Sequence, residues 1–591
     1  MNHNPEIILG SFACQETGIY RFEGLVTEIV ATEETEVVPA LKMIERAVQS
    51  GYYAVGFVSY EAAVALDHSL TVKLPTGFPL LWFGIYRERC LHLPRNLPEF
   101  SPQNFYELSA WQPAISRDEY RYALAKIKDY IGAGDCYQVN YTFQQRSTFT
   151  GDVRSFYYDL CRAQSTSYAA FFDLGRFSIL STSPELFFRL DKGVVTVRPM
   201  KGTAGRGKST DEDERISQSL QRNEKERAEN LMIVDLLRND LGRISENGSV
   251  TVNSLFDVET LATIHQMTST VSSRLRVDVG LVDIFRALFP CGSITGAPKK
   301  RSMEIIAELE NTPRGLYTGC IGYLAPEMRE AVFSVAIRTI VLDKDAGTGA
   351  LGVGSGITWY SEPDAEFEEC LSKGLFAQNS RPVFTLIESL LFSADSGYFL
   401  IDRHLKRLAD SARYFGFAID ICAARTRLEK SAEAISGRAK VRLILSSDGS
   451  LAVEVEPLVC STSDEISWIT FADVRVDSSH QFLYHKTSNR ELYHRELGKK
   501  PGCVDVIFLN ERNEVTEGAN NNIVVRKNGL LVTPPVTCGL LPGTFRAQLL
   551  ESGEITEQIL VPADLEQAEE IYLVNSVRKW RRVRLVTGEL K

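Results

Sequence analysis

The sequence lacks the spacing patterns by which cysteine and histidine bind zinc. Its 11 cysteines are scattered singly from Cys14 to Cys538 without a C-x-x-C pair, and its 8 histidines form no H-E-x-x-H pattern. We therefore expect reduced thiols, as in a cytosolic enzyme, rather than a disulfide framework. We also expect no metal bound through histidine.

Long apolar runs and a surplus of basic residues are also missing. No run approaches the ~20 residues that cross a bilayer, and the apolar segment from Ala331 to Leu342 is interrupted by Arg338. The start of the chain, Met1 to Glu6, has no basic region followed by an apolar core, so we expect no secretory signal and a cytoplasmic location. The formal net charge of -11 argues against non-specific binding to nucleic acid. An anionic substrate must therefore be met by a local cluster of positive groups.

A chain of 591 residues is too long for one hydrophobic core. The polar stretch from Ala377 to Pro382 follows a helical pattern and precedes a strand-like run, and it predicts a linker at residues 379–382. We place an N-terminal part at residues 1–115, a catalytic domain at 116–378 and a second domain at 383–591. Both halves alternate strand and helix patterns, which predicts an α+β fold with large, partly antiparallel sheets.

Lys201 lies where a strand pattern opens into a glycine-rich loop. The alternating segment Val194 to Val197 precedes it, and Gly205 and Gly207 follow. A lysine at such a position is a nucleophile if burial or a nearby cation lowers its pKa, because only the neutral amine attacks carbon. The alternative is a solvated loop lysine.

Acidic side chains are grouped on two predicted helices. Glu229 falls on the apolar face of the helix around residues 227–235. Glu366, Glu369 and Lys373 share one face of a helix that begins near Pro363, directly after the glycine-rich strand 352–359. Oxygen ligands of this kind suit Mg²⁺, which binds through one or two carboxylates plus substrate oxygens. The alternative is a solvated acidic surface.

These residues resemble the chorismate-utilising enzymes, among them the anthranilate, isochorismate and aminodeoxychorismate synthases. The resemblance covers about residues 120 to 376. The matching stretches are Gly134 to Asn140, Ser183 to Leu186, Arg198 to Thr203, Arg227 to Met232, Gly292 to Lys299, Ile337 to Thr339 and Gly354 to Lys373. It implies a large two-sheet α/β sandwich for this part of the chain.

The resemblance also implies roles for particular residues. Glu229, Glu366 and Glu369 correspond to the Mg²⁺ site of the family, and Glu185 to its general acid. The implied chorismate pocket consists of His265, Ser293, Thr295, Gly296, Tyr317, Arg338, Gly354, Gly356 and Lys373. Chorismate is a dianion, so Arg338, Lys373 and Mg²⁺ would supply the positive charge that an acidic protein needs.

Lys201 distinguishes members of the family from one another. Anthranilate synthases carry alanine at this position, whereas aminodeoxychorismate synthases carry lysine in a Pro-Ile-Lys-Gly-Thr motif, from which this chain departs only by Met200. The resemblance implies that the Lys201 amine adds at C2 of chorismate while Glu185 protonates the leaving 4-hydroxyl. Ammonia then enters at C4 and expels the lysine. Residues 1–115 fit the family only loosely.

Residues 383–591 resemble the class IV, pyridoxal-phosphate-dependent transaminases, and most closely aminodeoxychorismate lyase. The matching stretches are Arg403 to Leu408, Tyr484 to Arg490, Asn510 to Gly518, Thr533 to Pro535 and Gly539 to Arg546. The resemblance implies a two-subdomain α+β domain. Lys486 would bind the cofactor covalently and Glu517 would face the pyridine nitrogen, while Arg407 with the backbone of Gly543, Thr544 and Phe545 would hold the phosphate. Taken singly, Lys486 could be an exposed lysine and Glu517 a turn residue.

The two resemblances together predict a bifunctional enzyme that makes 4-aminobenzoate from chorismate. Because we find no cysteine-histidine glutaminase signature, we expect a separate glutamine amidotransferase subunit to supply ammonia. The second domain could also form a homodimer, and the sequence does not decide this. One alternative is an anthranilate or salicylate synthase fused to an amino-acid transaminase. Another is that one half has lost activity and serves as a binding or scaffold module.

Overall fold

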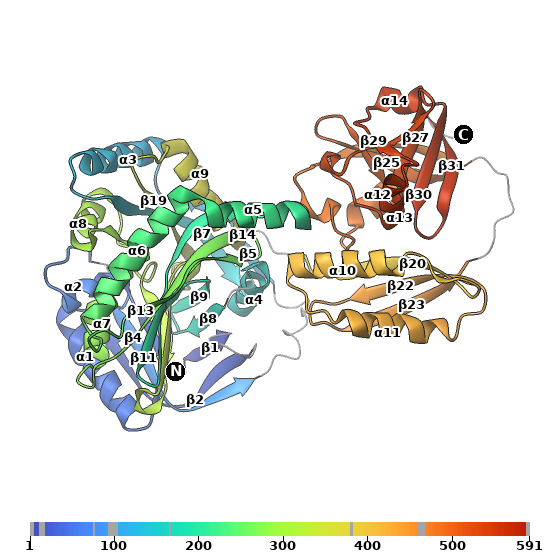
Figure 1. Cartoon of the computed structure of the whole chain (residues 1–591). Helices are drawn as coiled ribbons and strands as arrows, with labels where there is room; N and C mark the ends of the chain where they lie inside the picture. The colour runs from blue at the N-terminus through green and yellow to red at the C-terminus, as the bar shows by residue number, and fades with distance from the viewer. Residues whose placement is uncertain are drawn as a thin grey trace. The chain divides into compact units, whose positions relative to one another are not determined.

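The chain forms two compact units (Figure 1). The computed structural model describes residues 5–10, 18–74, 77–92, 105–164, 167–378, 382–458 and 467–586. The first unit is built from Met1–Gly205 and Ser217–Arg381, and the second from Arg206–Ile216 and Pro382–Lys591. Residues 379–381 of the predicted linker lie outside the described residues. The predicted division at 379–382 does not anticipate that the second unit includes Arg206–Ile216.

The first unit is a continuous series of antiparallel strands. In order of pairing they run β13, β14, β11, β10, β17, β16, β3, β4, β2, β1, β8, β9, β18, β19 and β7, with β12 added beside β14 and β5, β6 and β15 beside β7. Their bounds are β1 (Glu6–Gly10), β2 (Ile19–Ala31), β3 (Tyr53–Val58), β4 (Leu81–His92), β5 (Tyr106–Leu108), β6 (Gln112–Pro113), β7 (Gln138–Gly151), β8 (Tyr168–Asp173), β9 (Phe177–Ser183), β10 (Leu186–Asp191), β11 (Val194–Arg198), β12 (Met200–Gly205), β13 (Thr251–Thr260), β14 (Ile264–Arg274), β15 (Gly296–Ala297), β16 (Cys320–Leu324), β17 (Glu330–Val335), β18 (Thr339–Asp343) and β19 (Thr348–Ile357).

These strands form two layers that pack face to face. Residues of β3 alternate between two hydrophobic clusters: Val55 and Phe57 lie in a cluster with Phe172 and Ile179 of the other layer, whereas Val58 packs with the helices on the outer face. Because successive side chains of a strand point to opposite faces, both faces of β3 are buried, one between the two layers and one under the helices. The fold is the mixed α+β sandwich that the sequence predicted.

Helices cover the outer faces of both layers. The helices α1, α6 and α7 contribute to the cluster on one face, and α3, α4, α8 and α9 to the cluster on the other. Their bounds are α1 (Glu34–Gln49), α2 (Ala63–Leu66), α3 (Arg117–Gly132), α4 (Val153–Gln164), α5 (Thr210–Arg222), α6 (Glu224–Gly242), α7 (Leu281–Leu288), α8 (Lys299–Leu309) and α9 (Pro363–Gly374), with short 3-10 turns η1 (Tyr60–Ala62), η2 (Gly292–Ile294), η3 (Pro326–Met328) and η4 (Leu375–Ala377).

The second unit has two subdomains, as the class IV resemblance implied. The first is an antiparallel sheet of β21, β20, β22 and β23, covered by α10 and α11. The second is a mixed sheet in the order β26, β25, β24, β31, β30, β27, β28 and β29. The bounds are β20 (Leu386–Ser393), β21 (Gly397–Tyr398), α10 (Ile401–Phe415), α11 (Ile421–Ala432), β22 (Arg438–Leu445), β23 (Leu451–Pro457), β24 (Ser467–Val476), η5 (Gln481–Leu483), α12 (Glu491–Gly498), β25 (Cys503–Asn510), β26 (Val515–Gly518), β27 (Asn522–Lys527), β28 (Leu530–Thr533), η6 (Val536–Cys538), α13 (Thr544–Glu551), β29 (Thr556–Glu557), α14 (Pro562–Glu566), β30 (Glu570–Asn575) and β31 (Lys579–Leu585).

The segment Arg206–Ile216 packs on α10 of the second unit. The guanidinium of Arg206 lies 4.3 Å from the centre of the Tyr414 ring and donates to the Tyr414 carbonyl at 2.9 Å. The Tyr414 hydroxyl donates to the carbonyl of Gly207 at 2.7 Å, and Asp213 accepts from Arg206 Nε at 2.7 Å. Since Arg206 and Asp213 side chains are almost fully buried, this ion pair is well shielded from water.

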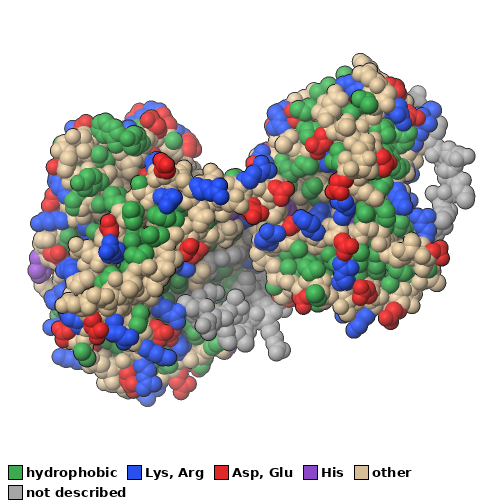
Figure 2. Space-filling model, in the orientation of Figure 1, with side chains coloured by type: hydrophobic (Ala, Val, Ile, Leu, Met, Phe, Trp, Pro, Cys, Tyr) green, Lys and Arg blue, Asp and Glu red, His purple; other side chains and the backbone are tan. Residues whose placement is uncertain are grey.

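Charged side chains of both signs are interspersed on the face drawn in Figure 2. Because the chain is acidic overall, positive charge must be concentrated locally to bind an anion. Among the residues that the structure describes, no helix is long and apolar enough to cross a membrane.

We predict that Gly322→Ala lowers the free energy of unfolding by about 1–3 kcal/mol. Gly322 of β16 pairs with Gly56 of β3, and a Cβ at Gly322 would lie 2.1 Å from the Val332 carbonyl oxygen and 2.6 Å from the Phe333 ring. Urea denaturation followed by tryptophan fluorescence measures the change. The control is Gly242→Ala at the end of α6, where no atom lies within 4 Å of the added Cβ. Equal stability of Gly322→Ala and the parent would contradict the prediction.

Candidate functional sites

Lys201 lies in an irregularity of strand β12. The pairing of β12 with β14 shifts register between Met200 and Thr203, so a β-bulge includes Lys201. Gly202 has φ +100, a left-handed conformation that glycine adopts without strain. The carbonyl of Lys201 accepts from Asn230 of α6 at 3.2 Å. A bulge re-aims a side chain relative to a regular strand, and the bond to α6 fixes the backbone at this point.

The amine of Lys201 is held away from water. Burial lowers its pKa, and the charge of Lys373 adds to this effect, while the carboxylates of Glu229, Glu369 and Glu226 oppose it. Gly356 of β19 leaves room for the amine, because a Cβ there would lie 2.3 Å from Lys201 Nζ. The structure thus shows a buried amine whose pKa is lowered, not the solvated lysine that the sequence left open.

Glu185 is a buried carboxyl whose pKa suits an acid. It lies between β9 and β10, 3% exposed, and accepts from Ser293 Oγ at 2.5 Å. Burial raises its pKa to about 7, against the opposing effects of the Ser293 hydrogen bond, the Met200 backbone and the charge of Lys201. A carboxyl with this pKa is partly protonated near neutral pH and can therefore donate a proton.

Of the three predicted metal carboxylates, two influence Lys201. The charges of Glu229 of α6 and Glu369 of α9 both act to raise the pKa of Lys201, and Lys373 forms an ion pair with Glu369 at 2.7 Å. The charge of Glu366 instead contributes to raising the pKa of Tyr120. Within the described part of the chain, no group of three or more His, Cys, Asp or Glu side chains is placed to hold a metal ion. The described carboxylates thus form no preformed cage of three, and a Mg²⁺ ion bound by Glu229 and Glu369 would have to complete its shell with substrate oxygens.

Burial acts against ionisation of Glu369, yet its pKa is lowered. Desolvation raises the pKa, but the charge and hydrogen bond of Lys373 and the charge of Lys201 outweigh it. Glu369 is therefore a carboxylate at neutral pH, the form that binds a metal cation.

The predicted chorismate-pocket residues lie on several neighbouring elements. Ser293, Thr295 and Gly296 lie in η2 and at β15, where Gly296 pairs with Val139 of β7. Gly354 and Gly356 lie on β19, and Lys373 donates to the carbonyl of Gly354 at 3.0 Å.

Tyr317, Arg338 and His265 complete the predicted set. A Cβ on Gly352 would lie 2.1 Å from the Tyr317 ring, so this ring packs directly on β19. Arg338 has φ +49 and donates to Gln164 at 2.6 Å; burial lowers its pKa to about 10. His265 pairs with Ala204 of the Lys201 strand and contacts Thr260 at 3.0 Å.

Sequence reasoning assigned no role to Gln138, although it quoted the stretch that contains this residue. Gln138 begins β7 and is 1% exposed, and its Oε1 has no hydrogen-bond partner among the described residues. A Cβ on Gly356 would lie 2.1 Å from Gln138 Nε2 and 2.3 Å from Lys201 Nζ. The amide and the amine therefore share one small space, which only the pairing of β7 with β19 reveals.

Lys486 lies at a junction of the two subdomains of the second unit. Its carbonyl accepts from the backbone of Ile387 at 2.9 Å, and Thr487 bridges to Leu386 of β20. Burial lowers the pKa of its amine to about 7, assisted by the charges of Arg490 and Arg407 and opposed by Glu388 and Glu517. A large fraction of this amine is therefore neutral at physiological pH, which excludes a simple exposed lysine.

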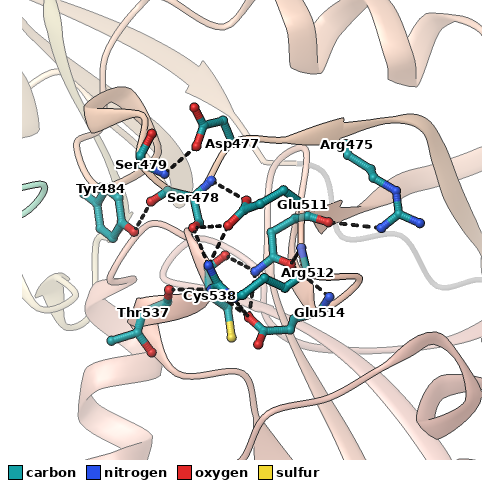
Figure 3. A network of polar contacts seen from close by, with 11 residues as sticks. Arg475, Asp477, Ser478, Ser479, Tyr484, Glu511, Arg512, Glu514, Thr537 and Cys538 are labelled. Carbon is teal, nitrogen blue, oxygen red and sulfur yellow. Dashed lines mark hydrogen bonds and ion pairs between the residues drawn. The ribbon is translucent and has the colours of Figure 1, made fainter. Parts of the chain in front are cut away.

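A polar network holds the segment before Lys486 (Figure 3). Glu511 accepts from the backbone and hydroxyl of Ser478 at 2.8 and 2.7 Å, and Arg512 donates to Ser478 Oγ at 2.8 Å. The carbonyl of Ser478 in turn accepts from the Tyr484 hydroxyl at 2.7 Å. The network thereby fixes Tyr484, two positions before Lys486.

Glu517 is a buried acceptor rather than a turn residue. It lies on β26 and accepts from the Tyr493 hydroxyl at 3.1 Å, Asn522 Nδ2 at 3.3 Å and the Leu541 backbone at 3.2 Å. Burial raises its pKa to about 7, against the opposing charges of Arg490 and Lys486. A cationic partner such as a protonated pyridine nitrogen would favour its ionised form.

The predicted phosphate ligands gather at the start of α13. Gly543 is the N-cap of this helix, and Thr544 and Phe545 form its first turn, where backbone N–H groups lack partners within the helix. The side chain of Arg407 is nearly buried and donates to the Pro542 carbonyl at 3.1 Å. A guanidinium beside a helix N-terminus suits a phosphate dianion. Together with Lys486 and Glu517, this donor set fits pyridoxal phosphate.

Comparison with known proteins finds one family model for each half of the chain. The model for chorismate binding enzymes matches residues 13–378, which is more than half of the chain. The chain belongs to the chorismate binding enzyme family. The model for class IV amino-transferases matches residues 385–586 of this family member. Pyridoxal phosphate is the cofactor that the class IV part implies.

Similar curated proteins cover the chorismate-binding part. Aminodeoxychorismate synthase component 1 of Klebsiella aerogenes is 43% identical over 267 residues, which are 45% of this chain and 58% of that protein. The protein of the same name from Bacillus subtilis is 40% identical over 266 residues, 45% of this chain and 56% of its own length. The chain thus spans somewhat over half the length of these relatives. A crystal structure of anthranilate synthase component I from Streptococcus pneumoniae covers 64% of this chain and 93% of its own, with 25% identity and a TM-score of 0.54.

We predict that Glu185→Gln changes how stability depends on pH. The pKa of Glu185 rises from 4.5 to about 7 on folding, so its contribution to stability is fully present below about pH 4.5 and is lost as pH rises to about 7. The variant lacks this loss and gains up to about 3 kcal/mol relative to the parent over that range. Urea denaturation of both proteins from pH 4.5 to 8 measures the difference. A constant difference would show that Glu185 ionises in the folded protein as in the unfolded chain.

Proposed function

We propose that this protein makes 4-aminobenzoate from chorismate in two steps, one in each unit. The observation that carries the first step is the pair formed by Lys201, an amine with a lowered pKa, and Glu185, a buried carboxyl with a raised pKa. A nucleophile and an acid whose environments shift their pKa values toward neutrality form the set that substitution of a hydroxyl requires.

In the first step, the Lys201 amine adds at C2 of chorismate, and Glu185 gives its proton to the leaving 4-hydroxyl, which departs as water. Ammonia then forms a bond at C4 and the lysine nitrogen leaves C2, so the net change replaces hydroxyl by amine. We further propose Mg²⁺ bound through Glu229 and Glu369, with Glu366 nearby, and a pocket of His265, Ser293, Thr295, Gly296, Tyr317, Arg338, Gly354, Gly356 and Lys373 for the substrate. The positive charges of Arg338 and Lys373 offset those of the dianion.

In the second step, the other unit converts 4-amino-4-deoxychorismate to 4-aminobenzoate and pyruvate. Pyridoxal phosphate supplies an electron sink at the carbon that bears the amine. Lys486 takes the proton from C4, and loss of pyruvate makes the ring aromatic. Glu517 would accept from the protonated pyridine nitrogen, and Arg407 with the backbone of Gly543, Thr544 and Phe545 would hold the phosphate. The neutral fraction of Lys486 that burial creates is what lets it act as a base.

We propose two further features of the enzyme. Its ammonia comes from a separate glutamine amidotransferase subunit, which the words "component 1" in the names of its relatives support. It works in the cytoplasm, which free thiols at the described cysteines support.

The decisive experiment supplies the purified protein with chorismate, Mg²⁺, pyridoxal phosphate and ammonium. We expect 4-aminobenzoate and pyruvate in equal amounts; anthranilate or salicylate as the product would refute the proposal.

We predict that Lys201→Ala abolishes 4-aminobenzoate formation and leaves chorismate binding largely intact, because the variant loses the nucleophile but keeps the groups that bind the carboxylates. Product chromatography measures the activity, and calorimetry measures the affinity for chorismate. The control is Lys344→Ala, which removes a lysine paired with Asp173 on the surface of the same unit. Formation of 4-aminobenzoate by Lys201→Ala at the parent rate would exclude the covalent role.

We predict that Lys486→Ala accumulates 4-amino-4-deoxychorismate and releases no pyruvate, because the first step does not use this lysine. Lys500→Ala is the control, since Lys500 pairs with Asp473 at the surface of the second unit. Chromatography of the reaction mixture, without any other lyase present, separates the intermediate from the product. Unchanged 4-aminobenzoate formation by Lys486→Ala would refute its assignment.

A further inference from the structure

A carboxylate lies next to the proposed phosphate site, where a negative charge is unexpected. Glu388 of β20 is 1% exposed. Its Oε1 accepts from Arg407 Nε at 2.9 Å, and its Oε2 accepts from Arg407 Nη2 at 2.7 Å. Oε2 also lies 2.6 Å from His404 Nδ1. Arg407 and His404 lie one turn apart on α10, so one carboxylate fixes both side chains.

The contacts continue from His404 to the start of α13. His404 is 1% exposed, and its second ring nitrogen, Nε2, lies 3.2 Å from Thr544 Oγ1. Thr544 is the first residue of α13 and is 5% exposed. A buried chain of hydrogen bonds therefore runs from Glu388 through His404 to a hydroxyl at the helix start.

The hydrogen-bond acceptors decide where the protons lie between Glu388, His404 and Thr544. Burial acts to raise the pKa of Glu388, but the charges and hydrogen bonds of Arg407 and His404 lower it to about 2. An ionised carboxylate only accepts, so His404 Nδ1 must carry a proton. Burial lowers the pKa of His404, although the charge and hydrogen bond of Glu388 act to raise it. In the neutral ring Nε2 is a bare acceptor, and the Thr544 hydroxyl must donate to it.

A phosphate group reverses this requirement. Phosphate oxygens are acceptors, so a hydroxyl that faces them must donate its proton outward. Thr544 can do so and keep its contact with His404 only if Nε2 carries a proton and becomes the donor. The alternative, in which Thr544 turns away, leaves a buried ring nitrogen without a partner, at the cost that attends an unsatisfied buried polar group.

We propose that binding of a phosphate group at the start of α13 is coupled to the uptake of one proton by His404. The proposal rests on the pyridoxal-phosphate function of this unit. Glu388 and His404 are then positioning residues: they orient Arg407 and the Thr544 hydroxyl, and His404 turns the hydroxyl into a donor. The imidazolium forms between the Glu388 carboxylate and the incoming dianion, where charge-assisted hydrogen bonds stabilise it on both sides.

Four groups from different elements face His404. Glu388 of β20 favours the protonated ring, whereas Arg407 of α10 and Lys486, which follows η5, oppose it. Thr544 of α13 is neutral and responds only through its hydroxyl. Without a bound dianion, burial and the charge of Arg407, with a contribution from the protonated fraction of Lys486, outweigh one carboxylate and lower the pKa of the ring, so it is neutral near pH 8. The dianion adds the negative charge that shifts this balance.

The test is calorimetry of pyridoxal phosphate binding to the full-length apoprotein at about pH 8, where the phosphate is a dianion. Titrations in two buffers of different ionisation enthalpy give the number of protons taken up. We expect the parent to take up about one proton more than His404→Gln, which keeps a donor for Thr544 but does not titrate. Thr544→Val, which leaves His404 and Glu388 in place, also loses this proton, whereas Thr544→Ser retains it.

The matched control is His494→Gln, which changes an exposed histidine of α12 in the same unit. We expect it to take up as many protons as the parent. Equal proton uptake by the parent, His404→Gln and Thr544→Val overturns the proposed coupling while leaving the cofactor assignment intact. Failure of the parent itself to bind pyridoxal phosphate, seen as the absence of a binding heat and of a cofactor absorption band, refutes the lyase function and this proposal with it.

Discussion

Removal of lysine amines from water is the constraint on which both sites depend. An exposed amine is protonated at neutral pH and neither attacks carbon nor accepts a proton. In each unit, burial is the largest influence on the amine and lowers its pKa, and a second cation strengthens the effect: Lys373 acts on Lys201, and Arg490 acts on Lys486. The surrounding sheets and helices are needed to keep these side chains out of bulk solvent.

The two sites solve the accompanying electrostatic problem in different ways. Around Lys201 the charges of Glu229 and Glu369 oppose the lowering of its pKa. Around Lys486 the opposing carboxylates are committed elsewhere: Glu388 binds Arg407 and His404, and Glu517 accepts from Tyr493 and Asn522. Burial lowers the pKa of Lys486 to about 7, although the charges of Glu388 and Glu517 still oppose this shift.

The sequence predicted the α+β fold and both family matches, because these depend on local periodicity and on motifs that are contiguous in the chain. The roles of the residues in the two sites stay predictions. It did not reveal features that depend on distant strands meeting. Gln138 shares space with Lys201 only because β7 pairs with β19. Glu388 on β20 precedes Arg407 on α10 by 19 residues, and nothing in its strand pattern shows that it binds that arginine. The bulge at Lys201 arises from pairing with β14 and has no local signature.

The segment Arg206–Ile216 has a consequence for how the two activities can be separated. Because the chain enters the second unit after Gly205, leaves it after Ile216 and enters it again at Pro382, three covalent connections join the units. Cleavage at the single predicted linker would leave two of them intact, but both lead only to Arg206–Ile216. Residues 382–591 would then be held to the rest of the chain only by the non-covalent contacts of this segment, such as that of Arg206 with Tyr414. A gene split at the same point would yield a second unit without the guanidinium that stacks on Tyr414. The predicted linker is therefore not the only covalent connection between the two units.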